Sequence, residues 1–405
     1  MNHIERLLQT LAPKGVEFRK LGEVLEYDQP NKYCVTSKEF DESYPTPVLT
    51  AGKTFILGYT NEKDNIYQAS KSSPVIIFDD FTTATQWVDF PFKVKSSAMK
   101  ILLPKNPTIN IRFIFFYMQT IPYNISGEHT RQWISRYSQI TIPIPPLEIQ
   151  QEIVKILDAF TELNTELNTE LKARKKQYEY YQNMLLDFKG INQNHKDAKM
   201  SAKTYPKRLK TLLQTLAPKG VEFRKLGEVC DFQKGKSITK KAVTFGKVPV
   251  ISGGRQPAYY HNEANRSGET IAISSSGVYA GYVSYWDIPV FLADSFSVSP
   301  KQKTLMPKYL FHYLTTQQDA IHATKSTGGI PHVYSKDLQN FLIPIPPLEI
   351  QQEIVKILDQ FLALTTDLLA GIPAEIKARK KQYEYYREKL LSFKPLTPHK
   401  EVKKC

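Results

Sequence analysis

The chain has 405 residues, of which 41% are hydrophobic and 12% aromatic, so it can form at least two packed domains and is not a disordered polypeptide. Its formal net charge of +14 favours a polyanionic partner, and nucleic acid is the first candidate. It has no apolar run near the ~20 residues of a membrane span and no signal peptide, which predicts a cytoplasmic protein without membrane contact. Cys34, Cys230 and Cys405 are far apart and predict neither a zinc site nor a disulfide framework.

The sequence consists of two copies of one unit. Residues 7 to 24 recur at 212 to 229, residues 142 to 158 recur letter for letter at 343 to 359, and residues 172 to 181 recur at 377 to 386. The offset is 205 residues at both ends, because residue 7 matches 212 and residue 172 matches 377. The segments between the blocks, 25 to 141 and 230 to 342, agree only in traces. We therefore expect the repeated parts to meet one kind of partner twice and the variable parts to meet two different targets.

Each variable segment predicts an α/β domain with a twisted sheet. In the first, short strand-like runs at 48 to 50, 74 to 78 and 93 to 103 precede a helix at 111 to 120. In the second, strand-like runs at 248 to 252, 270 to 274, 280 to 285 and 291 to 297 precede a helix at 307 to 322. These two domains and the long helices described next together predict a fold of the α+β (mixed) class.

A proline-rich entry and a long helix follow each variable segment. Proline lacks a donor and keeps the preceding residue extended, so the helix begins after it, and residues 147 to 188 predict a rod of about 60 Å at ~1.5 Å per residue. Apolar positions recur in steps of three and four, with a stutter in the repeats Thr-Glu-Leu-Asn, Thr-Glu-Leu-Asn and Thr-Glu-Leu-Lys at 161 to 172. In the second rod the Gly371-Ile372-Pro373 interruption predicts a kink or break.

We expect the two rods to pair as an antiparallel coiled coil in a circular, pseudo-two-fold arrangement. The alternative is that each is an amphipathic helix lying on its own domain. The residues expected on the seam, or at a partner surface, are Ile153, Phe160, Leu167, Tyr178 and Tyr181 in the first rod and Ile354, Phe361, Leu368, Tyr383 and Tyr386 in the second.

The repeats also set the predicted domain boundaries. They are an N-terminal helix at 1 to 15 that completes the second repeat, a first domain at 16 to 141, a helix at 142 to 189, a linker at 190 to 211, a short helix and turn at 212 to 220, a second domain at 221 to 342, a helix at 343 to 394 and a tail at 395 to 405.

Motifs for catalysis are missing. Gly235-Lys236-Ser237 resembles the end of a phosphate-binding loop, but Cys230 occupies the place of its first glycine. Asp79 and Asp80 could suggest a nuclease metal site, but they also fit a strand end, and the matching place in the second domain holds Ser275 and Ser276. We therefore predict a noncatalytic chain with no metal site.

Binding motifs are more prominent. Glycines allow a close approach to phosphate, Lys and Arg supply charge, and Arg or Gln can read purine edges. The candidate DNA-binding residues are Lys53, Lys71, His129, Arg131 and Gln132 in the first domain and Lys234, Lys236, Lys240, Arg255, Gln256, Lys325, Gly328, Gly329 and His332 in the second.

The chain resembles the specificity subunit of type I restriction-modification systems along essentially its whole length. The residues that carry the resemblance are the Pro-Pro-Leu-Glu-Ile-Gln-Gln-Glu-Ile entry at 145 to 153 and 346 to 354 and the Thr-Glu-Leu repeats. The resemblance implies two target-recognition domains, each reading half of a split site in double-stranded DNA. It also implies that two methyltransferase subunits dock on the repeated regions and bind S-adenosylmethionine, and that restriction subunits join for cleavage that needs ATP and Mg. In that family the specificity subunit binds no cofactor itself. The alternative is a coiled-coil scaffold protein that does not bind DNA.

The rod could act as a ruler between the half-sites, because half-sites are read about one turn of DNA, 34 to 36 Å, apart. Removing one Thr-Glu-Leu-Asn unit would shorten the helix by about 6 Å and leave about 40° of rotation, so we expect the spacer of the DNA site to change while both half-sites stay the same.

Overall fold

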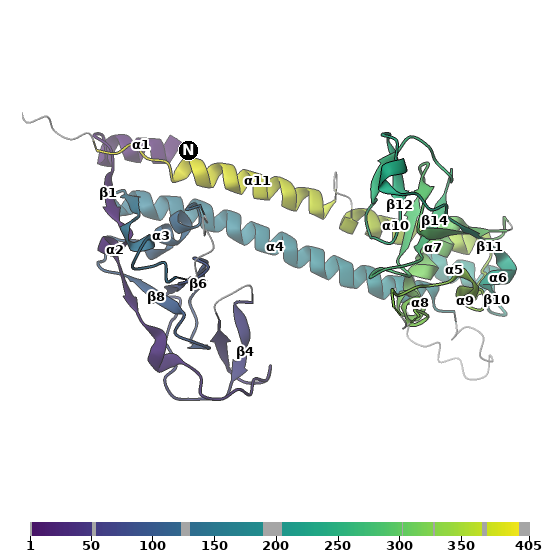
Figure 1. Cartoon of the computed structure of the whole chain (residues 1–405), viewed down its shortest axis with the longest axis horizontal. Coiled ribbons are helices and arrows are strands. Elements are labelled where there is room, and N and C mark those ends of the chain that lie inside the picture. Colours follow the sequence, from purple (N-terminus) through teal and green to yellow (C-terminus); the bar gives the residue numbers. More distant parts are fainter. Residues whose placement is uncertain are drawn as a thin grey trace, which may run out of the picture. The chain divides into compact units, whose positions relative to one another are not determined.

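The computed structural model describes residues 2–50, 54–122, 130–188, 205–301, 303–326, 329–366 and 371–396. The chain divides into two compact units, each of which holds one variable segment. The first unit contains residues 1–167 and 376–405, and the second contains residues 168–375 (Figure 1).

The first unit begins with a helix and continues through a mixed domain into a long helix. Its elements are α1 (Asn2–Leu11), β1 (Glu17–Lys20), α2 (Leu21–Val24), β2 (Leu25–Asp28), η1 (Pro30–Tyr33), β3 (Thr46–Leu49), β4 (Ile56–Thr60), β5 (Val75–Asp79), β6 (Thr85–Val88), β7 (Lys93–Val94), β8 (Met99–Pro104), α3 (Ile111–Met118), η2 (Tyr137–Gln139), β9 (Thr141–Ile144), the first half of α4 (Leu147–Leu186) and most of α11 (Ile372–Leu390).

Alternation along β5 explains how this unit is layered. The strand lies inside an antiparallel sheet of order β2-β8-β5-β6, and its neighbouring side chains face opposite sides. Ile76 and Phe78 join the core beneath α3. Val75 and Ile77 join a second core, towards the small sheet β4-β3-β7. The antiparallel pair β1 and β9 connects the domain to the start of α4.

The N-terminal helix packs against the end of the second long helix within the first unit, as the circular arrangement predicts (Figure 1). Ile4 shares a core with Leu390 and Leu391. The amide of Val16 donates to the carbonyl of Lys394, and the amide of Leu396 donates to the carbonyl of Val16, both at 3.0 Å. Gly15 permits this approach, because its φ is +109° and a Cβ there would lie 2.7 Å from the carbonyl oxygen of Pro395.

The second unit repeats the order of the first. Its elements are the second half of α4, α5 (Lys207–Leu216), β10 (Phe223–Lys225), α6 (Leu226–Val229), β11 (Cys230–Lys234), η3 (Lys240–Ala242), β12 (Val248–Ile251), β13 (Tyr259–His261), β14 (Thr270–Ser274), β15 (Val283–Trp286), β16 (Phe291–Leu292), β17 (Ser295–Pro300), α7 (Pro307–Thr316), α8 (Gln318–Ala323), α9 (Ser335–Leu338), β18 (Leu342–Pro344) and α10 (Leu348–Thr366).

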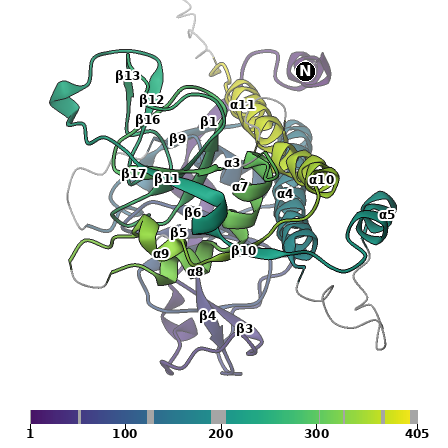
Figure 2. The same cartoon turned by 90° about the vertical axis from the view of Figure 1, so that its right-hand side faces the viewer.

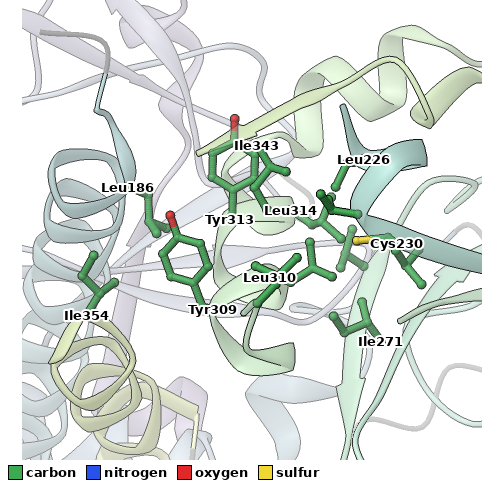
Figure 3. Close-up of a cluster of buried hydrophobic side chains, with 14 of the residues drawn as sticks. Leu186, Leu226, Cys230, Ile271, Tyr309, Leu310, Tyr313, Leu314, Ile343 and Ile354 are labelled. Carbon is green, nitrogen blue, oxygen red and sulfur yellow. The ribbon is translucent and has the colours of Figure 1, made fainter. Parts of the chain in front are cut away.

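The sheets of the second unit have the same connections as those of the first. The larger sheet has the order β11-β17-β14-β15 and the smaller one β13-β12-β16; Figure 2 labels β11 and β17 of the larger sheet and all three strands of the smaller. Figure 3 shows the main core, where Tyr309 and Leu310 of α7 lie between the sheet and the helices that carry Leu186 and Ile354. Cys230 belongs to this core, and burial raises the pKa of its thiol to about 12.

The long helices follow the prediction closely, and four shorter elements differ from it. Helix α4 runs without a break for 40 residues. Helix α10 ends at Thr366, and α11 (Ile372–Leu390) begins anew with Pro373 in its first turn, where a missing N–H costs nothing. The expected strands at 93 to 103 and 291 to 297 are each split, into β7 and β8 and into β16 and β17. The expected helix at 307 to 322 is split at Gln317, and β15 begins only at Val283.

Among the described helices, none combines the length and the apolar character that crossing a membrane requires.

Candidate nucleic-acid interface

Three loops of the second unit converge at one end of its larger sheet. They are the turn after β12, the turn between β14 and β15, and the segment before α9. The amide of Val333 donates to the carbonyl of Ser275 at 2.9 Å, and the amide of Gly277 donates to the carbonyl of Pro331 at 3.0 Å. A Cβ at Gly253 would lie 2.6 Å from the carbonyl oxygen of Ser276, so only glycine allows the first turn to pack against the second. The backbone thus fixes the three loops together.

Cations and aromatic rings lie side by side on these loops. The Arg255 guanidinium lies 4.9 Å from the ring centre of Tyr279 and 5.7 Å from that of Tyr282. Lys325 reaches the carbonyl of Val278 from the third loop, and the His332 ring stacks on Tyr334. The sequence pattern had selected Arg255, Lys325 and His332, and the structure brings all three to this loop cluster. Tyr279, Tyr282 and Tyr334 were missed, because only the fold shows that they flank these cations.

A half-buried histidine lies next to this cluster. The Nε2 atom of His322 is buried and has no hydrogen-bond partner among the described residues. Burial lowers the pKa of His322, and the nearby Lys325 lowers it further, which favours the neutral ring. The positive charge of the cluster therefore comes from Arg255 and Lys325, and not from His322.

The other described candidates of the second domain are exposed. Gln256 is exposed beside Arg255, and Gly329 is exposed with a φ of +85° and open space around it. Gly328 falls outside the described residues. Lys234 is exposed at the end of β11, and Lys236 and Lys240 are exposed on the segment that leads from it to β12. The amides of Gly235 and Lys236 donate to the carbonyls of Ser295 and Leu292, so they are not available to hold a phosphate group.

In the first unit the equivalent loop is held in the same way. The amides of Gln132 and Trp133 donate to the carbonyl and to the carboxylate of Asp80, both at 2.8 Å. Arg131 is exposed beside them. Gln132 is only 2% exposed, and its side-chain amide donates to Thr130. The expectation that Gln132 reads a base therefore does not fit its burial, since a base reader must reach the surface.

The acidic pair after β5 has a structural role. Asp79 accepts hydrogen bonds from the amides of Phe81 and Thr82 and so closes the turn. Asp80 is buried and pairs with the buried Lys100 at 3.7 Å. Burial lowers the pKa of Lys100, while Asp80 raises it. No group of described residues has the cluster of ligands that a metal ion needs.

Lys71 lies at a different place from Arg131. It lines an open cavity of about 460 Å³ with Trp87, Arg112 and Asp158, where the first domain meets α4. The expected sites at Lys53 and His129 lie outside the described residues.

A joint of matching design connects each variable domain to its long helix. In the first unit the Gln150 side chain accepts from the amide of Asn110 at 2.8 Å and donates to the carbonyls of Thr108 and Pro145. In the second unit Gln351 accepts from the amide of Met306 at 2.9 Å and donates to the carbonyls of Thr304 and Pro346. Both glutamines are fully buried.

About two helical turns after each glutamine, an aspartate of the same helix binds a cation of the domain. Asp158 accepts from Arg112, at 2.8 Å from Nε and 2.7 Å from a terminal nitrogen. Asp359 accepts from Lys308 at 2.6 Å and from His312 at 3.0 Å. The repeated helices therefore orient two different domains through the same two side-chain positions.

The predicted seam residues occupy equivalent positions in the two units. In the first unit Phe160 stacks on Tyr386 at 5.5 Å and contacts Tyr383, and Ile153 is buried. In the second unit Tyr181 stacks on Phe361 at 5.1 Å, and Ile354 is buried. The Tyr178 hydroxyl lies 3.2 Å from Nδ1 of His312. Leu167 is buried on α4, while Leu368 is outside the described residues.

A duplicated scaffold that carries two unlike loop surfaces is the architecture of a recognition protein for a two-part target. The family model described as the type I restriction modification DNA specificity domain matches residues 13–176 and again residues 218–378. The chain therefore belongs to the type I restriction-modification specificity family.

Relatives match the chain from end to end. It is 40% identical to the EcoR124I/EcoR124II specificity subunit of Escherichia coli, over 98% of both chains. It is 30% identical to a putative type I restriction enzyme specificity subunit of Haemophilus influenzae, over 96% of this chain and 98% of the relative. A crystal structure of a type I S subunit from M. genitalium has the same fold, with a TM-score of 0.64 and 18% identity over 93% of this chain and 96% of that one.

Proposed function

We propose that this chain selects the DNA site of a type I restriction-modification complex, with each variable domain reading one half of a bipartite sequence. The observation that carries the proposal is the combination of equal joints and unlike loops. Gln150 and Gln351 hold the two domains in the same way, whereas the loops around Arg255 and around Arg131 differ in sequence. Two domains that are attached to the long helices in the same way but carry different loops suit the recognition of two different DNA sequences by one scaffold.

The repeated surfaces fit two identical partners. Tyr180 is 59% exposed and its counterpart Tyr385 is 58% exposed, while Leu11 and Leu216 are 42% and 40% exposed. Exposed apolar residues that are duplicated in identity and in exposure favour two copies of one docking protein. We assign these surfaces to two methyltransferase subunits. In this proposal S-adenosylmethionine binds to those subunits, ATP and Mg act with the restriction subunits, and the chain itself supplies orientation and recognition without making bonds.

The test is single-molecule methylome sequencing of a host with and without this chain, with its partner subunits present in both. A bipartite adenine-methylated motif is expected only when the chain is present. Exchanging residues 221 to 342 for the second domain of another family member should change one half of the motif and leave the other intact. A motif that persists without the chain would contradict the proposal.

The same readout tests the ruler. The Thr-Glu-Leu-Asn units lie inside the continuous helix α4, so deleting one of them removes about 6 Å of helix. The gap between the half-sites should change and the half-sites should not. Altered half-sites with an unchanged gap would show that α4 does not set the spacing.

A further inference from the structure

The segment that joins β11 to β12 has an unusual combination of charge and exposure. Residues 234 to 247 contain five lysines, all of them exposed, and no acidic residue. Phe245 lies among them with 94% of its surface exposed. Single exposed apolar residues are common on proteins, so exposure alone decides nothing. What distinguishes Phe245 is that a rigid backbone holds it outward in a strongly basic setting.

The backbone around Phe245 is braced on both sides. The amide of Thr244 donates to Nδ1 of His261 at 3.0 Å. At Gly246 a Cβ would lie 2.2 Å from the carbonyl oxygen of His261, so no other residue fits there without moving the backbone. The His261 ring in turn packs edge-on against Phe291 at 5.4 Å. In Figure 2 the green segment that leads into β12 projects from the domain as a loop.

The matching segment of the first unit is built in the opposite way. Between η1 and β3, Phe40 packs on β4, where a Cβ at Gly58 would lie 2.8 Å from the Phe40 Cβ. Lys95 lies over the same ring at 5.4 Å. This segment carries Glu39, Asp41 and Glu42 against a single lysine, Lys38. The same place in the fold therefore holds a packed phenylalanine in an acidic loop in one unit and an exposed one in a basic loop in the other.

Given the proposed function, on which this step rests, we infer that Phe245 is a DNA-contacting wedge whose ring stacks on a base at a kinked step, while Lys240, Lys241 and Lys247 contact the flanking phosphates. The charge of the segment favours a polyanion as its partner. Five lysines without an acidic residue in the segment attract the closely spaced phosphates of a nucleic acid. Apolar wedges and aromatic rings are the groups that proteins insert against bases. Bracing at Thr244 and Gly246 means that the ring is already ordered before DNA arrives.

The experiment uses the full chain assembled with its methyltransferase subunits and a duplex that carries the motif found by methylome sequencing. Affinity is measured over a range of salt concentrations. Phe245→Ala should weaken binding by about 5- to 100-fold while leaving the salt dependence unchanged, since stacking carries no charge. Lys247→Gln should weaken binding and reduce the slope of log affinity against log salt by about one. Ile288→Ala, an exposed apolar residue beside Asp287, is the matched control and should bind as the parent does.

A second variant tests direct stacking. Phe245→Trp should bind within about threefold of the parent, and its added indole fluorescence should be quenched by the duplex, because stacking on a base quenches indole emission. Two outcomes would overturn the wedge: Phe245→Ala binding DNA as tightly as the parent, or Phe245→Ala weakening the assembly with methyltransferase subunits while DNA affinity is kept. If the parent complex itself shows no salt-dependent affinity for the duplex, the proposed function fails and the wedge fails with it.

Discussion

The two joints between variable domain and long helix differ in chemistry although they agree in position. In the first unit Arg112 bonds to Asp158, and its guanidinium lies 4.4 Å from the ring centre of Trp87 and 4.8 Å from that of Phe116. In the second unit Lys308 takes the place of Arg112, Tyr285 that of Trp87 and His312 that of Phe116. The same arrangement, a cation between an aromatic ring and a carboxylate of the long helix, is thus built twice from different residues of the domains.

The second joint adds a polar chain, whereas the matching position of the first joint is the apolar Phe116. The Tyr178 hydroxyl contacts His312 Nδ1, and Nε2 of the same ring donates to Asp359. Both ring nitrogens of His312 therefore have a partner, although the ring is fully buried. The comparison shows which half of a joint must stay constant. The helix keeps its glutamine and aspartate, and each domain needs only to supply a cation and a ring at the right place.

The largest expected effect comes from the constant half. Gln150→Ala and Gln351→Ala each remove three hydrogen bonds from a buried site and leave an amide and two carbonyls without these partners. We expect each change to lower the free energy of unfolding of its own unit by about 2–4 kcal/mol. Hydrogen exchange followed by mass spectrometry should show lost protection in α3 for the first variant and in α7 for the second.

The neighbouring glutamines are the matched controls, because Gln151 and Gln352 are exposed in the same two blocks. Their replacement by alanine should change stability by no more than about 0.5 kcal/mol. A large loss from Gln150→Ala beside a negligible loss from Gln351→Ala would mean that the two joints are not equivalent.

An intermediate effect is expected from the carboxylate of the second joint. Burial on its own would raise the pKa of Asp359, but hydrogen bonds from His312 and Lys308 outweigh burial and lower it. A carboxyl whose folded pKa lies below its unfolded value, about 3.9, stabilises the protein above that pH, and this contribution is lost as the pH falls through the folded pKa. Asp359→Asn should therefore cost about 1–2 kcal/mol at pH 7, and the difference from the parent should shrink below about pH 4.

This difference is measured by urea unfolding between pH 3 and pH 7, with hydrogen exchange in α7 and α10 as the readout. Glu179→Gln removes an exposed carboxyl from α4 of the same unit and serves as the control, with a small change at every pH. A constant gap between Asp359→Asn and the parent over the whole range would show that the carboxylate contributes no pH-dependent stability.

The smallest effect concerns the variable half. Arg112→Lys keeps the charge but loses the planar group that lies among Trp87 and Phe116, so we expect a loss of about 1 kcal/mol. Lys308→Arg should stay within about 0.5 kcal/mol, because the existing lysine makes one contact with Asp359 and lies further from its ring. Shifts in the midpoint of thermal unfolding compare the two. Equal losses would mean that the rings around Arg112 contribute nothing particular.

Repetition in the sequence was enough to predict the architecture. Identical blocks had to make identical contacts, and Gln150 and Gln351 do so. The same holds for Phe160 with Tyr386 and Phe361 with Tyr181, although the two phenylalanines lie two residues beyond the identical blocks. The break before Pro373 also followed from residue type alone. These features depend on local preference and on internal comparison, both of which a single sequence contains.

The loop surfaces could be predicted only in part. Gln132 was expected at the surface, but Asp80, 52 residues earlier, holds its segment inward. Tyr279 and Tyr282 were overlooked, because their neighbour Arg255 lies on another turn. Gly246 reveals the bracing of Phe245 only once His261 is seen to lie behind it. Contacts between distant residues decide which side chains of a loop can reach a ligand, and no local pattern encodes them.

The ladder between Val16 and residues 394 to 396 has a consequence for biosynthesis. The second unit is contained in residues 168–375, whereas the first requires residues 376 to 396 to cover Ile4 and to pair with Val16. At ~5–20 residues per second, the ribosome releases this last partner only after the second unit has emerged. The unit that is translated first is therefore the last to complete its fold. Until residues 376 to 396 emerge, the apolar face of α1 remains uncovered.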